Sequence, residues 1–453
     1  MRFILVKPAE HRLQGKISLL GDKSIANRSI IISAISQGKT TVKNFPANKD
    51  CLTTIRVFRK LGIKIRQYSQ DKNTQTITVF GKGLRGLKKP QGPIFAGDSG
   101  TTLRLTLGVL AGQRFSVTLN AGAALSQRPM RRVTVPLRMM GAEISARHIS
   151  KTKNLIPNTK FEEYPPITIK GVDPKPITYN MPLASAQVKS AILFAGLYAR
   201  GTTRVIEPIK TRDHTERMLR LFKARIKLQQ NTVVIKGNRE LVSPGQVLIP
   251  ADISSASFFI VAATILAGSR VLIKNVNLNP SRMGIIRVLK RMGACIKNQK
   301  EKTKIQDYEP RGDLIVEGSP LRGTVIKREE IPSLIDELPI LMVAACYARG
   351  RTVFEGAGEL RVKETDRIRS MSDNLRKMGA HIKVMNRGGG EKIIIQGAEG
   401  LRGASVASYA DHRTAMSMII AALRAKGATR IDDVTCINKS FPNFLSLLQT
   451  LLN

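Results

Sequence analysis

The sequence predicts an α/β protein of two domains, each containing three copies of one unit of helices and strands. Two observations support this prediction. The 453 residues are too many for a single hydrophobic core. Six times along the chain, a polar helix opening leads into an Ala-rich apolar run, a glycine and a β-branched strand.

The first copy opens at residues 21–28 with the sequence GDKSIANR. Asp22 and Ser24 are of types that cap helix N-termini, and Ser24 shares a helix face with Arg28, four residues on. Lys23 stands beside them. Two interpretations are open: an ordinary capped helix with solvated charges, or an anion site made by a helix N-terminus and its cations.

The same opening recurs five more times, and each copy continues to a glycine that we expect to cap the helix C-terminus. The further openings lie at Asp98–Arg104, Ser185–Lys189, Asp252–Ser257, Ile335–Pro339 and Asp411–Met416. The six glycines are Gly38, Gly112, Gly201, Gly268, Gly350 and Gly427.

A second helix follows most copies and ends at a glycine of its own, namely Gly62, Gly141, Gly293 or Gly379. The third copy reads FKARI at residues 222–226 and has lost this glycine. Each unit is therefore predicted to run strand–helix–strand–helix–strand. The Ala-rich helices should lie inside each three-unit domain, with the sheets outside.

A turn signal at residues 243–245 separates the third copy from the fourth. The first twenty residues precede the first copy and are free to pair with the second half of the chain. We therefore predict one discontinuous domain of residues 1–20 and 249–453 and another of residues 21–248. Two linking strands, near 20–22 and 245–250, should form a hinge that closes on ligand binding.

Proline-rich sequence within the second unit predicts a loop over residues 153–176.

The charge balance is unusual, with 74 Lys and Arg against 33 Asp and Glu and a net charge of +41. Such an excess points to anionic partners, which include nucleic acid and anionic substrates. The cations are dispersed, however, and aromatic residues make up only 5% with no tryptophan, which is poor material for stacking bases. We expect no specific nucleic-acid partner.

Neither a disulfide nor a zinc site is predicted, because the four cysteines are far apart and have no histidine at ligand spacing. No apolar stretch is long enough to span a membrane or to form a signal peptide. We expect a cytoplasmic protein without a membrane partner.

The helix openings carry more cations than capping requires, among them Lys23, Arg28 and Arg413. If all six helix N-termini face one cleft, their dipoles and these cations make a pocket that attracts anions. Asp336 and Glu364 are carboxylates among many cations and are candidates for proton transfer. The alternative for each is an exposed salt-bridge partner.

Nine motifs in order carry a resemblance to a known family. They are GDKSIANR, GDSGTTLR, QRPM, SAQVKSA, TRDHTE, ADISSASFF, RVKETDR, DHRTAMS and NKSFPNF, and they span about residues 15–445. Together they resemble the 5-enolpyruvylshikimate-3-phosphate (EPSP) synthase family. The resemblance implies a two-domain inside-out α/β barrel of six βαβαββ pseudo-repeats, three per domain.

The activity that the resemblance implies is a carboxyvinyl transfer in the shikimate pathway, toward chorismate and the aromatic amino acids. The enolpyruvyl group of phosphoenolpyruvate moves to the 5-hydroxyl of shikimate 3-phosphate, and phosphate is released. The reaction passes through a tetrahedral intermediate and uses no metal or organic cofactor.

The resemblance also implies the binding residues, carried over from matching motif positions. Lys23, Ser24 and Arg28 contact the substrates, with Lys23 next to phosphoenolpyruvate. The remaining shikimate 3-phosphate ligands are Ser185, Ala186, Gln187 and Arg212, with Asp336 on the shikimate hydroxyls and Lys363 close by. Those around phosphoenolpyruvate are Gly100, Arg128, Arg367, Arg413 and Lys439.

For catalysis, we assign Asp336 as the base toward the 5-hydroxyl. Glu364, with Lys23, relays the proton to and from the methylene carbon.

Three positions qualify the resemblance. Asp98 stands where the family often has asparagine, and pairing with Arg128 or Lys23 would neutralise it. Ala186 stands where some relatives have serine, so a substrate contact there must come from the backbone. Gly100 leaves room beside phosphoenolpyruvate, which predicts sensitivity to glyphosate.

Two alternative functions are an enolpyruvyl transfer to a different acceptor and the binding of nucleic acid. The sister enolpyruvyl transferase acts on UDP-N-acetylglucosamine and usually carries a reactive cysteine before the matching Arg-Pro, whereas residues 122–128 here contain no thiol. A nucleic-acid-binding module would use the +41 charge, but recognisable RNA- or DNA-binding signatures are missing. We expect a monomer that binds only small-molecule substrates.

Overall fold

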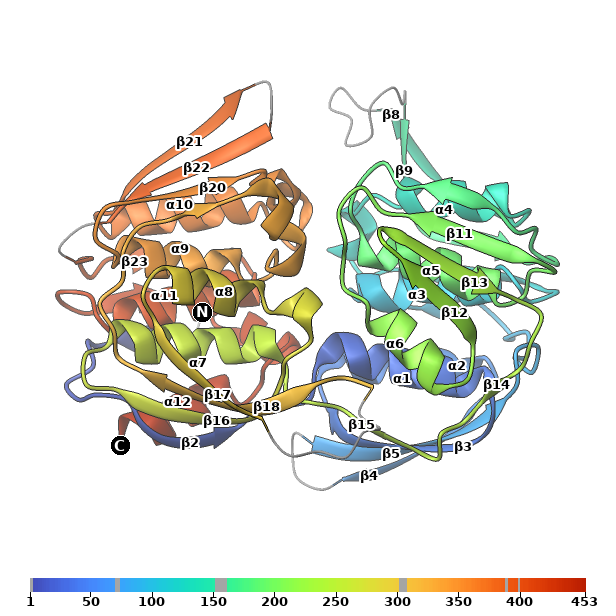
Figure 1. Ribbon diagram of the computed structural model, residues 1–453. Coiled ribbons are helices and arrows are strands. Elements are labelled where there is room, and N and C mark those ends of the chain that lie inside the picture. Colours follow the sequence, from blue (N-terminus) through green and yellow to red (C-terminus); the bar gives the residue numbers. More distant parts are fainter. Residues whose placement is uncertain (1–2, 70–73, 151–160, 301–307, 388–389, 398–399) are drawn as a thin grey trace. The chain divides into compact units, whose positions relative to one another are not determined.

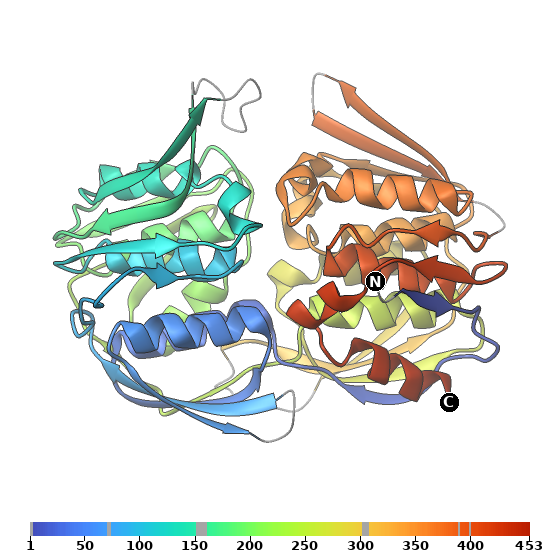
Figure 2. The same cartoon turned by 180° about the vertical axis from the view of Figure 1, so that it is seen from behind.

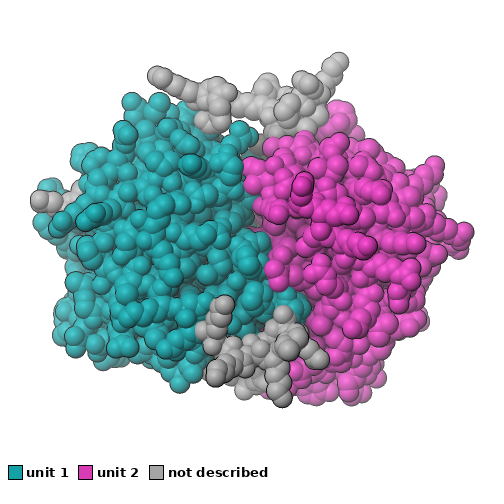
Figure 3. All heavy atoms as spheres, viewed as in Figure 1, with its two compact units in different colours: residues 1–20, 250–453 teal, residues 21–249 magenta. Residues whose placement is uncertain are grey.

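The computed structural model describes residues 3–69, 74–150, 161–300, 308–387, 390–397 and 400–453. Within these residues it is a mixed α/β protein with six small sheets (Figures 1 and 2). The chain divides into two compact units, coloured separately in Figure 3. Unit 1 comprises Met1–Leu20 and Pro250–Asn453, and unit 2 comprises Gly21–Ile249.

Unit 2 contains three sheets of one plan, in which a short strand pairs in parallel with the strand that follows an inner helix. That strand then pairs with an antiparallel hairpin. The first sheet comprises β14 (Leu241–Val242), β3 (Ser36–Pro46), β5 (Thr74–Lys82) and β4 (Lys64–Ser69), with β15 (Gln246–Leu248) also on β3. The second comprises β6 (Ile94–Phe95), β7 (Ser116–Asn120), β9 (Phe161–Lys170) and β8 (Glu143–Ser150). The third comprises β10 (Thr178–Asn180), β11 (Thr202–Ile206), β13 (Thr232–Lys236) and β12 (Arg225–Gln229).

The helices of unit 2 alternate between inner ones that begin at the polar openings and outer ones that follow. The inner helices are α1 (Lys23–Ala34), α3 (Gly100–Leu110) and α5 (Ala186–Gly196). The outer helices are α2 (Lys49–Lys60), α4 (Arg131–Met139) and α6 (His214–Leu221), and a 3-10 turn, η1 (Leu125–Gln127), precedes α4.

Unit 1 repeats the plan. Its sheets comprise β17 (Cys295–Lys300), β18 (Arg311–Glu317), β16 (Arg270–Asn277) and β2 (Gln14–Ser18); then β19 (Val325–Ile326), β20 (Arg351–Glu355), β22 (Gly390–Gln396) and β21 (His381–Arg387); then β1 (Ile4–Val6), β24 (Thr429–Ile431) and β23 (Ser405–Val406). Its α-helices are α7 (Ile253–Ile265), α8 (Gly284–Arg291), α9 (Leu338–Cys346), α10 (Arg367–Lys377), α11 (His412–Ala422) and α12 (Phe444–Leu452). Its 3-10 turns are η2 (Pro280–Arg282), η3 (Arg328–Ser333), η4 (Ala357–Val362) and η5 (Thr435–Lys439).

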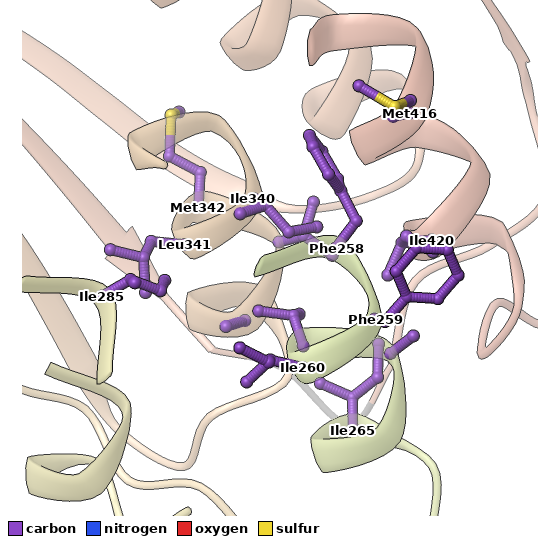
Figure 4. Close-up of a cluster of buried hydrophobic side chains, with 14 of the residues drawn as sticks. Phe258, Phe259, Ile260, Ile265, Ile285, Ile340, Leu341, Met342, Met416 and Ile420 are labelled. Atoms are coloured by element: carbon purple, nitrogen blue, oxygen red, sulfur yellow. The ribbon is translucent and has the colours of Figure 1, made fainter. Parts of the chain in front are cut away.

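The inner helices of unit 1 are buried on almost every side, and most of their residues are apolar. All residues of α9 and α11 are buried, and α7 leaves only Ser255 partly accessible. Figure 4 shows Phe258 and Ile260 of α7 beside Ile340 of α9 and Met416 of α11. The prediction of Ala-rich helices inside and sheets outside is confirmed.

The sixth copy departs from the predicted repeat. After β24 the chain runs through η5 and α12, and the sheet of this copy has three strands where the other sheets include an antiparallel hairpin. The N-terminal strand β1 fills the place by pairing antiparallel with β24, where Ile4 lies opposite Ile431. The six small sheets agree with the predicted six repeats, and the first twenty residues pair with the second half of the chain, as expected. The last repeat differs from the others in taking its antiparallel strand from residues 4–6.

The six glycines predicted as C-caps do not cap the helices. The C-cap residue of α1 is Ile35 and that of α3 is Ala111, while Gly38 lies within β3 and Gly112 in the turn after α3. A Cβ at Gly112 would meet the ring of Tyr198 at 2.1 Å, so close packing requires a glycine at this turn.

The glycines after the second helices have left-handed backbone conformations, with φ of +87° at Gly62 and +104° at Gly141. In the third copy, Lys223 takes this place with φ of +66°. The lost glycine therefore leaves the turn unchanged and puts a lysine in a strained conformation.

The Pro-rich segment predicted as a loop over 153–176 contains a strand. Residues 161–170 form β9, which pairs antiparallel with both β7 and β8. Residues 151–160 lie outside the described part of the chain. Among the described residues, no helix combines the length and the apolar character needed to cross a membrane.

Candidate active site

In unit 2, the start of α1 holds a buried arginine. Asp22 caps the helix by accepting a hydrogen bond from the Ile25 amide at 3.0 Å. Arg28, only 3% exposed, donates from Nε to Thr215 Oγ1 at 2.6 Å and from Nη2 to Ser190 Oγ at 2.9 Å. The guanidinium therefore joins α1 to α5 and α6 through hydroxyl groups.

The starts of α3 and α5 are joined by Gln187. Its Oε1 accepts a hydrogen bond from Arg104 Nη1 at 2.6 Å, and its Nε2 donates to Thr101 Oγ1 at 2.9 Å. Ser185 caps α5 through its hydroxyl, which accepts from the Val188 amide. Helix N-termini that carry arginines in this way favour phosphate and carboxylate groups.

Gly100 is the first residue of α3 and lies against two arginines. A Cβ added there would come within 3.2 Å of Nη1 of both Arg104 and Arg128, and within 3.4 Å of the Leu125 side chain. An added methyl group would therefore have to displace a guanidinium group.

The suggested neutralisation of Asp98 by Arg128 or Lys23 is not what the structure shows. Asp98 Oδ1 instead accepts a hydrogen bond from the Leu125 amide at 3.1 Å, which ties the turn before Arg128 to the start of α3. Lys23 Nζ pairs with Asp50 Oδ2 at 3.0 Å. Within the described parts of the chain, no ion pair involves Asp98.

In unit 1, three carboxylates lie around Arg367, whose side chain is 1% exposed. Its Nε lies 2.9 Å from Asp411 Oδ2, its Nη2 lies 2.6 Å from Glu364 Oε2, and its Nη1 lies 3.6 Å from Asp336 Oδ1. Arg413 Nη1 donates to the Asp336 carbonyl at 2.7 Å. The two predicted catalytic carboxylates therefore share one buried arginine.

Burial and charge oppose each other in this group. Burial alone would raise the pKa of Asp411, but Arg367 at 2.9 Å and the nearby His412 outweigh it and lower that pKa. Burial would likewise lower the pKa of Arg367, yet Asp411, Glu364 and Asp336 together raise it. Arg367 and Asp411 thus form a buried ion pair. Glu364 and Asp336 contact the same arginine but are more accessible to solvent.

Three more predicted residues lie outside the inner helices. Lys363 follows η4, where its Nζ lies 3.7 Å from Glu359 Oε1. Arg212 lies in the segment before α6. Lys439 ends η5 with an exposed side chain.

The buried partners of the predicted site residues were missed from sequence. Asp411 was interpreted only as part of a helix opening, and Thr215 only as part of the TRDHTE motif. A cap position is visible locally, whereas the pairing of Asp411 with Arg367 joins residues 44 apart in the chain.

No group of three or more His, Cys, Asp or Glu side chains that could hold a metal ion occurs among residues the structure describes. The four cysteines are free, with Cys51, Cys346 and Cys436 buried. The prediction that no metal or cofactor takes part stays a prediction.

Comparisons with known proteins agree over nearly the whole chain. The family model for EPSP synthase (3-phosphoshikimate 1-carboxyvinyltransferase) matches residues 8–448. The 3-phosphoshikimate 1-carboxyvinyltransferase of Desulforamulus reducens is 44% identical over 449 residues, which cover 99% of each chain. That of Petrotoga mobilis is 46% identical over 448 residues, which cover 98% of each chain.

A solved structure is similar as well. The EPSP synthase of Acinetobacter baumannii superposes with a TM-score of 0.83 at 40% sequence identity, covering 99% of this chain and 97% of that one. The resemblance predicted from the nine motifs is confirmed. The chain belongs to the EPSP synthase family of 3-phosphoshikimate 1-carboxyvinyltransferases.

Proposed function

We propose that this chain transfers the enolpyruvyl group of phosphoenolpyruvate to the 5-hydroxyl of shikimate 3-phosphate and releases phosphate. The observation that best supports the proposal is the buried Arg367, which holds two accessible carboxylates, Asp336 and Glu364, next to a second arginine, Arg413. Such a group combines anion binding with proton transfer.

The binding roles follow the two sets of residues. Shikimate 3-phosphate is bound by Ser24, Arg28, Ser185, the backbone of Ala186, Gln187 and Arg212, with Asp336 and Lys363 on the shikimate hydroxyls. Phosphoenolpyruvate is bound by Lys23, Gly100, Arg128, Arg367, Arg413 and Lys439. Support comes from the hydrogen bonds that fix Arg28 and Gln187 at helix starts and from the lack of a side chain at Gly100.

The reaction needs two proton movements. In the addition step, Asp336 takes the proton of the 5-hydroxyl as the hydroxyl oxygen bonds to C2 of phosphoenolpyruvate, while Glu364, which starts protonated, delivers its proton to the C3 methylene. The product is a tetrahedral ketal that still carries the phosphate. In the elimination step, the C2–O bond to phosphate breaks, and Glu364 with Lys23 takes a proton back from C3. The departing phosphate accepts the proton held by Asp336, so both carboxyl groups return to their starting states.

A phosphate-release assay tests the proposed substrate pair. We expect phosphate release from phosphoenolpyruvate with shikimate 3-phosphate and none with UDP-N-acetylglucosamine as acceptor. The opposite preference would assign the chain to the sister activity. Release with neither acceptor, together with salt-sensitive binding to single-stranded DNA, would instead favour a nucleic-acid-binding function.

Glyphosate is expected to inhibit in competition with phosphoenolpyruvate, because Gly100 leaves space beside Arg128. Gly100→Ala should weaken this inhibition and raise the KM for phosphoenolpyruvate by about three- to tenfold, since its methyl group displaces a guanidinium by a fraction of an ångström. Gly92→Ala, where an added Cβ meets nothing within 4 Å, is the matched control. Weak, non-competitive inhibition of the unaltered protein would contradict the placement of Gly100.

We further propose a monomer that works in the cytoplasm and closes about a hinge at 20–22 and 245–250. Light scattering coupled to size exclusion should report the mass of one chain. Small-angle scattering should show a smaller radius of gyration with shikimate 3-phosphate. An unchanged radius would count against closure.

A further inference from the structure

Lys189 of α5 is a buried lysine that the proposed reaction does not use. Its side chain is 1% exposed, and its ammonium group lies between two carboxylates. Nζ is 2.6 Å from Glu216 Oε1 and 3.0 Å from Glu207 Oε2. Both carboxylates are themselves buried, with side chains 1% and 4% exposed. The three groups form a closed ionic cluster in unit 2.

The charged state of Lys189 is maintained by its partners. Burial alone would lower the pKa of Lys189, but Glu216 and Glu207 outweigh it and raise that pKa. Burial raises the pKa of Glu216 despite the nearby ammonium group. Because the side chains of all three groups are at most 4% exposed, a direct contact of Lys189 with substrate is not expected.

Each member of the cluster is attached to a different segment of the proposed shikimate 3-phosphate set. Glu207 Oε1 accepts hydrogen bonds from the amide of Thr211, at 3.0 Å, and from its hydroxyl. Thr211 is the residue immediately before Arg212. The carboxylate therefore sets the position of the segment that carries Arg212.

Glu216 lies on α6 next to Thr215, whose hydroxyl accepts the hydrogen bond from Arg28 Nε at 2.6 Å. Lys189 lies next to Ser190, whose hydroxyl accepts from Arg28 Nη2 at 2.9 Å and also bonds Thr215 Oγ1 at 2.7 Å. The Lys189–Glu216 pair thus fixes the distance between the two hydroxyl groups that orient the Arg28 guanidinium.

The third attachment is within α5 itself. The Lys189 amide donates to the Ser185 carbonyl at 3.1 Å, so Lys189 lies one helical turn after the residues that open α5. An ammonium group can donate three hydrogen bonds, and a lysine at this place can hold two carboxylates from different segments at once.

We propose that Lys189 is a positioning residue for shikimate 3-phosphate, which locks the start of α5, the segment before Arg212 and the Arg28 guanidinium into one arrangement. The proposal rests on the assignment of these residues to shikimate 3-phosphate. It predicts that loosening the cluster changes recognition of this substrate and leaves the chemistry of phosphoenolpyruvate unchanged.

Removing Lys189 alone would leave two buried carboxylates without a cation and could unfold the unit. The test therefore uses the charge-neutral triple variant Lys189→Met, Glu207→Gln, Glu216→Leu, in which no buried charge is left unpaired. We expect it to fold, to raise the KM for shikimate 3-phosphate by about tenfold or more, and to change kcat and the KM for phosphoenolpyruvate by less than about threefold. Lys210→Met, at an exposed lysine of the same segment, is the matched control.

A folded triple variant with an unchanged KM for shikimate 3-phosphate would overturn the proposal, as would equal rises in both KM values. Lys189→Arg keeps the charge in a different geometry and decides the matter if the triple variant does not fold: a raised KM for shikimate 3-phosphate alone supports the proposal, and an unchanged one overturns it. Arg28→Met is measured in parallel. If it leaves that KM unchanged, the assignment of Arg28 fails first; if only the Lys189 variants are silent, the positioning role fails alone.

Discussion

Asp336→Asn is expected to lower kcat by about 10²- to 10⁴-fold, the range by which a positioned general base contributes. Asparagine has nearly the same size as aspartate, and the Asp336 backbone carbonyl can still accept the hydrogen bond from Arg413. The variant lacks the carboxylate that takes the 5-hydroxyl proton, while the amide oxygen can still face Arg367 and Arg413. Steady-state kinetics with both substrates, together with calorimetric titration of shikimate 3-phosphate, should show a lost kcat with binding largely intact.

Glu364→Gln is expected to have an effect of similar size for a different reason. The Glu364 carboxylate lies 2.6 Å from Arg367 and, in the proposed mechanism, exchanges protons with the C3 methylene. In deuterated water, the variant should therefore incorporate deuterium into phosphoenolpyruvate more slowly than Asp336→Asn does. Glu329→Gln, at an exposed carboxylate of the same unit, is the control. Unchanged turnover in either catalytic variant would remove that residue from the mechanism.

Arg367→Met is expected to lower the free energy of unfolding by about 3–5 kcal/mol, the usual cost of removing one partner of a buried ion pair. Asp411 is 0% exposed and would lose its guanidinium partner, while Glu364 and Asp336 would lose a shared cation. Urea unfolding followed by circular dichroism measures the change. Arg369→Met, on the same helix with a side chain 73% exposed, should stay within about 0.5 kcal/mol of the unaltered protein.

The pH dependence of this loss follows from the lowered pKa of Asp411. A carboxyl group whose folded pKa is depressed stabilises the fold above its unfolded pKa of about 3.9, and this stabilisation is lost as the pH falls through the folded pKa. The difference in unfolding free energy between Arg367→Met and the unaltered protein should therefore be largest near pH 7 and become smaller below about pH 4. A difference that stays constant down to pH 3 would show that the Asp411 pair is not its source.

Local sequence was sufficient to locate the helix starts and the repeat. Asp22, Ser99 and Ser185 each cap a helix through a hydrogen bond to a residue within the next turn, so the signal is contained in a few consecutive residues. The motifs that carry the family resemblance include these starts. The family and the α/β class could therefore be predicted without any knowledge of tertiary contacts.

Local rules failed where a distant segment decided the outcome. Residues 161–170 contain two prolines and were predicted as loop, yet β7 and β8 both pair with them. The first twenty residues were expected to pair with the second half of the chain, but the strand they join could not be predicted: β1 pairs with β24 of the sixth copy. In both cases the pairing partner lies outside the sequence window that a propensity argument examines.

The family, the fold class and the residues that open the inner helices could all be predicted from short stretches of sequence, because the motifs and the helix caps each lie within a few consecutive residues. The buried partners of the charged residues became known from the three-dimensional contacts: Asp411 pairs with Arg367, and Glu207 and Glu216 pair with Lys189. A buried charge is stable only beside a partner of opposite sign, and that partner can come from anywhere in the chain. The choice is made by packing, which no stretch of consecutive residues encodes.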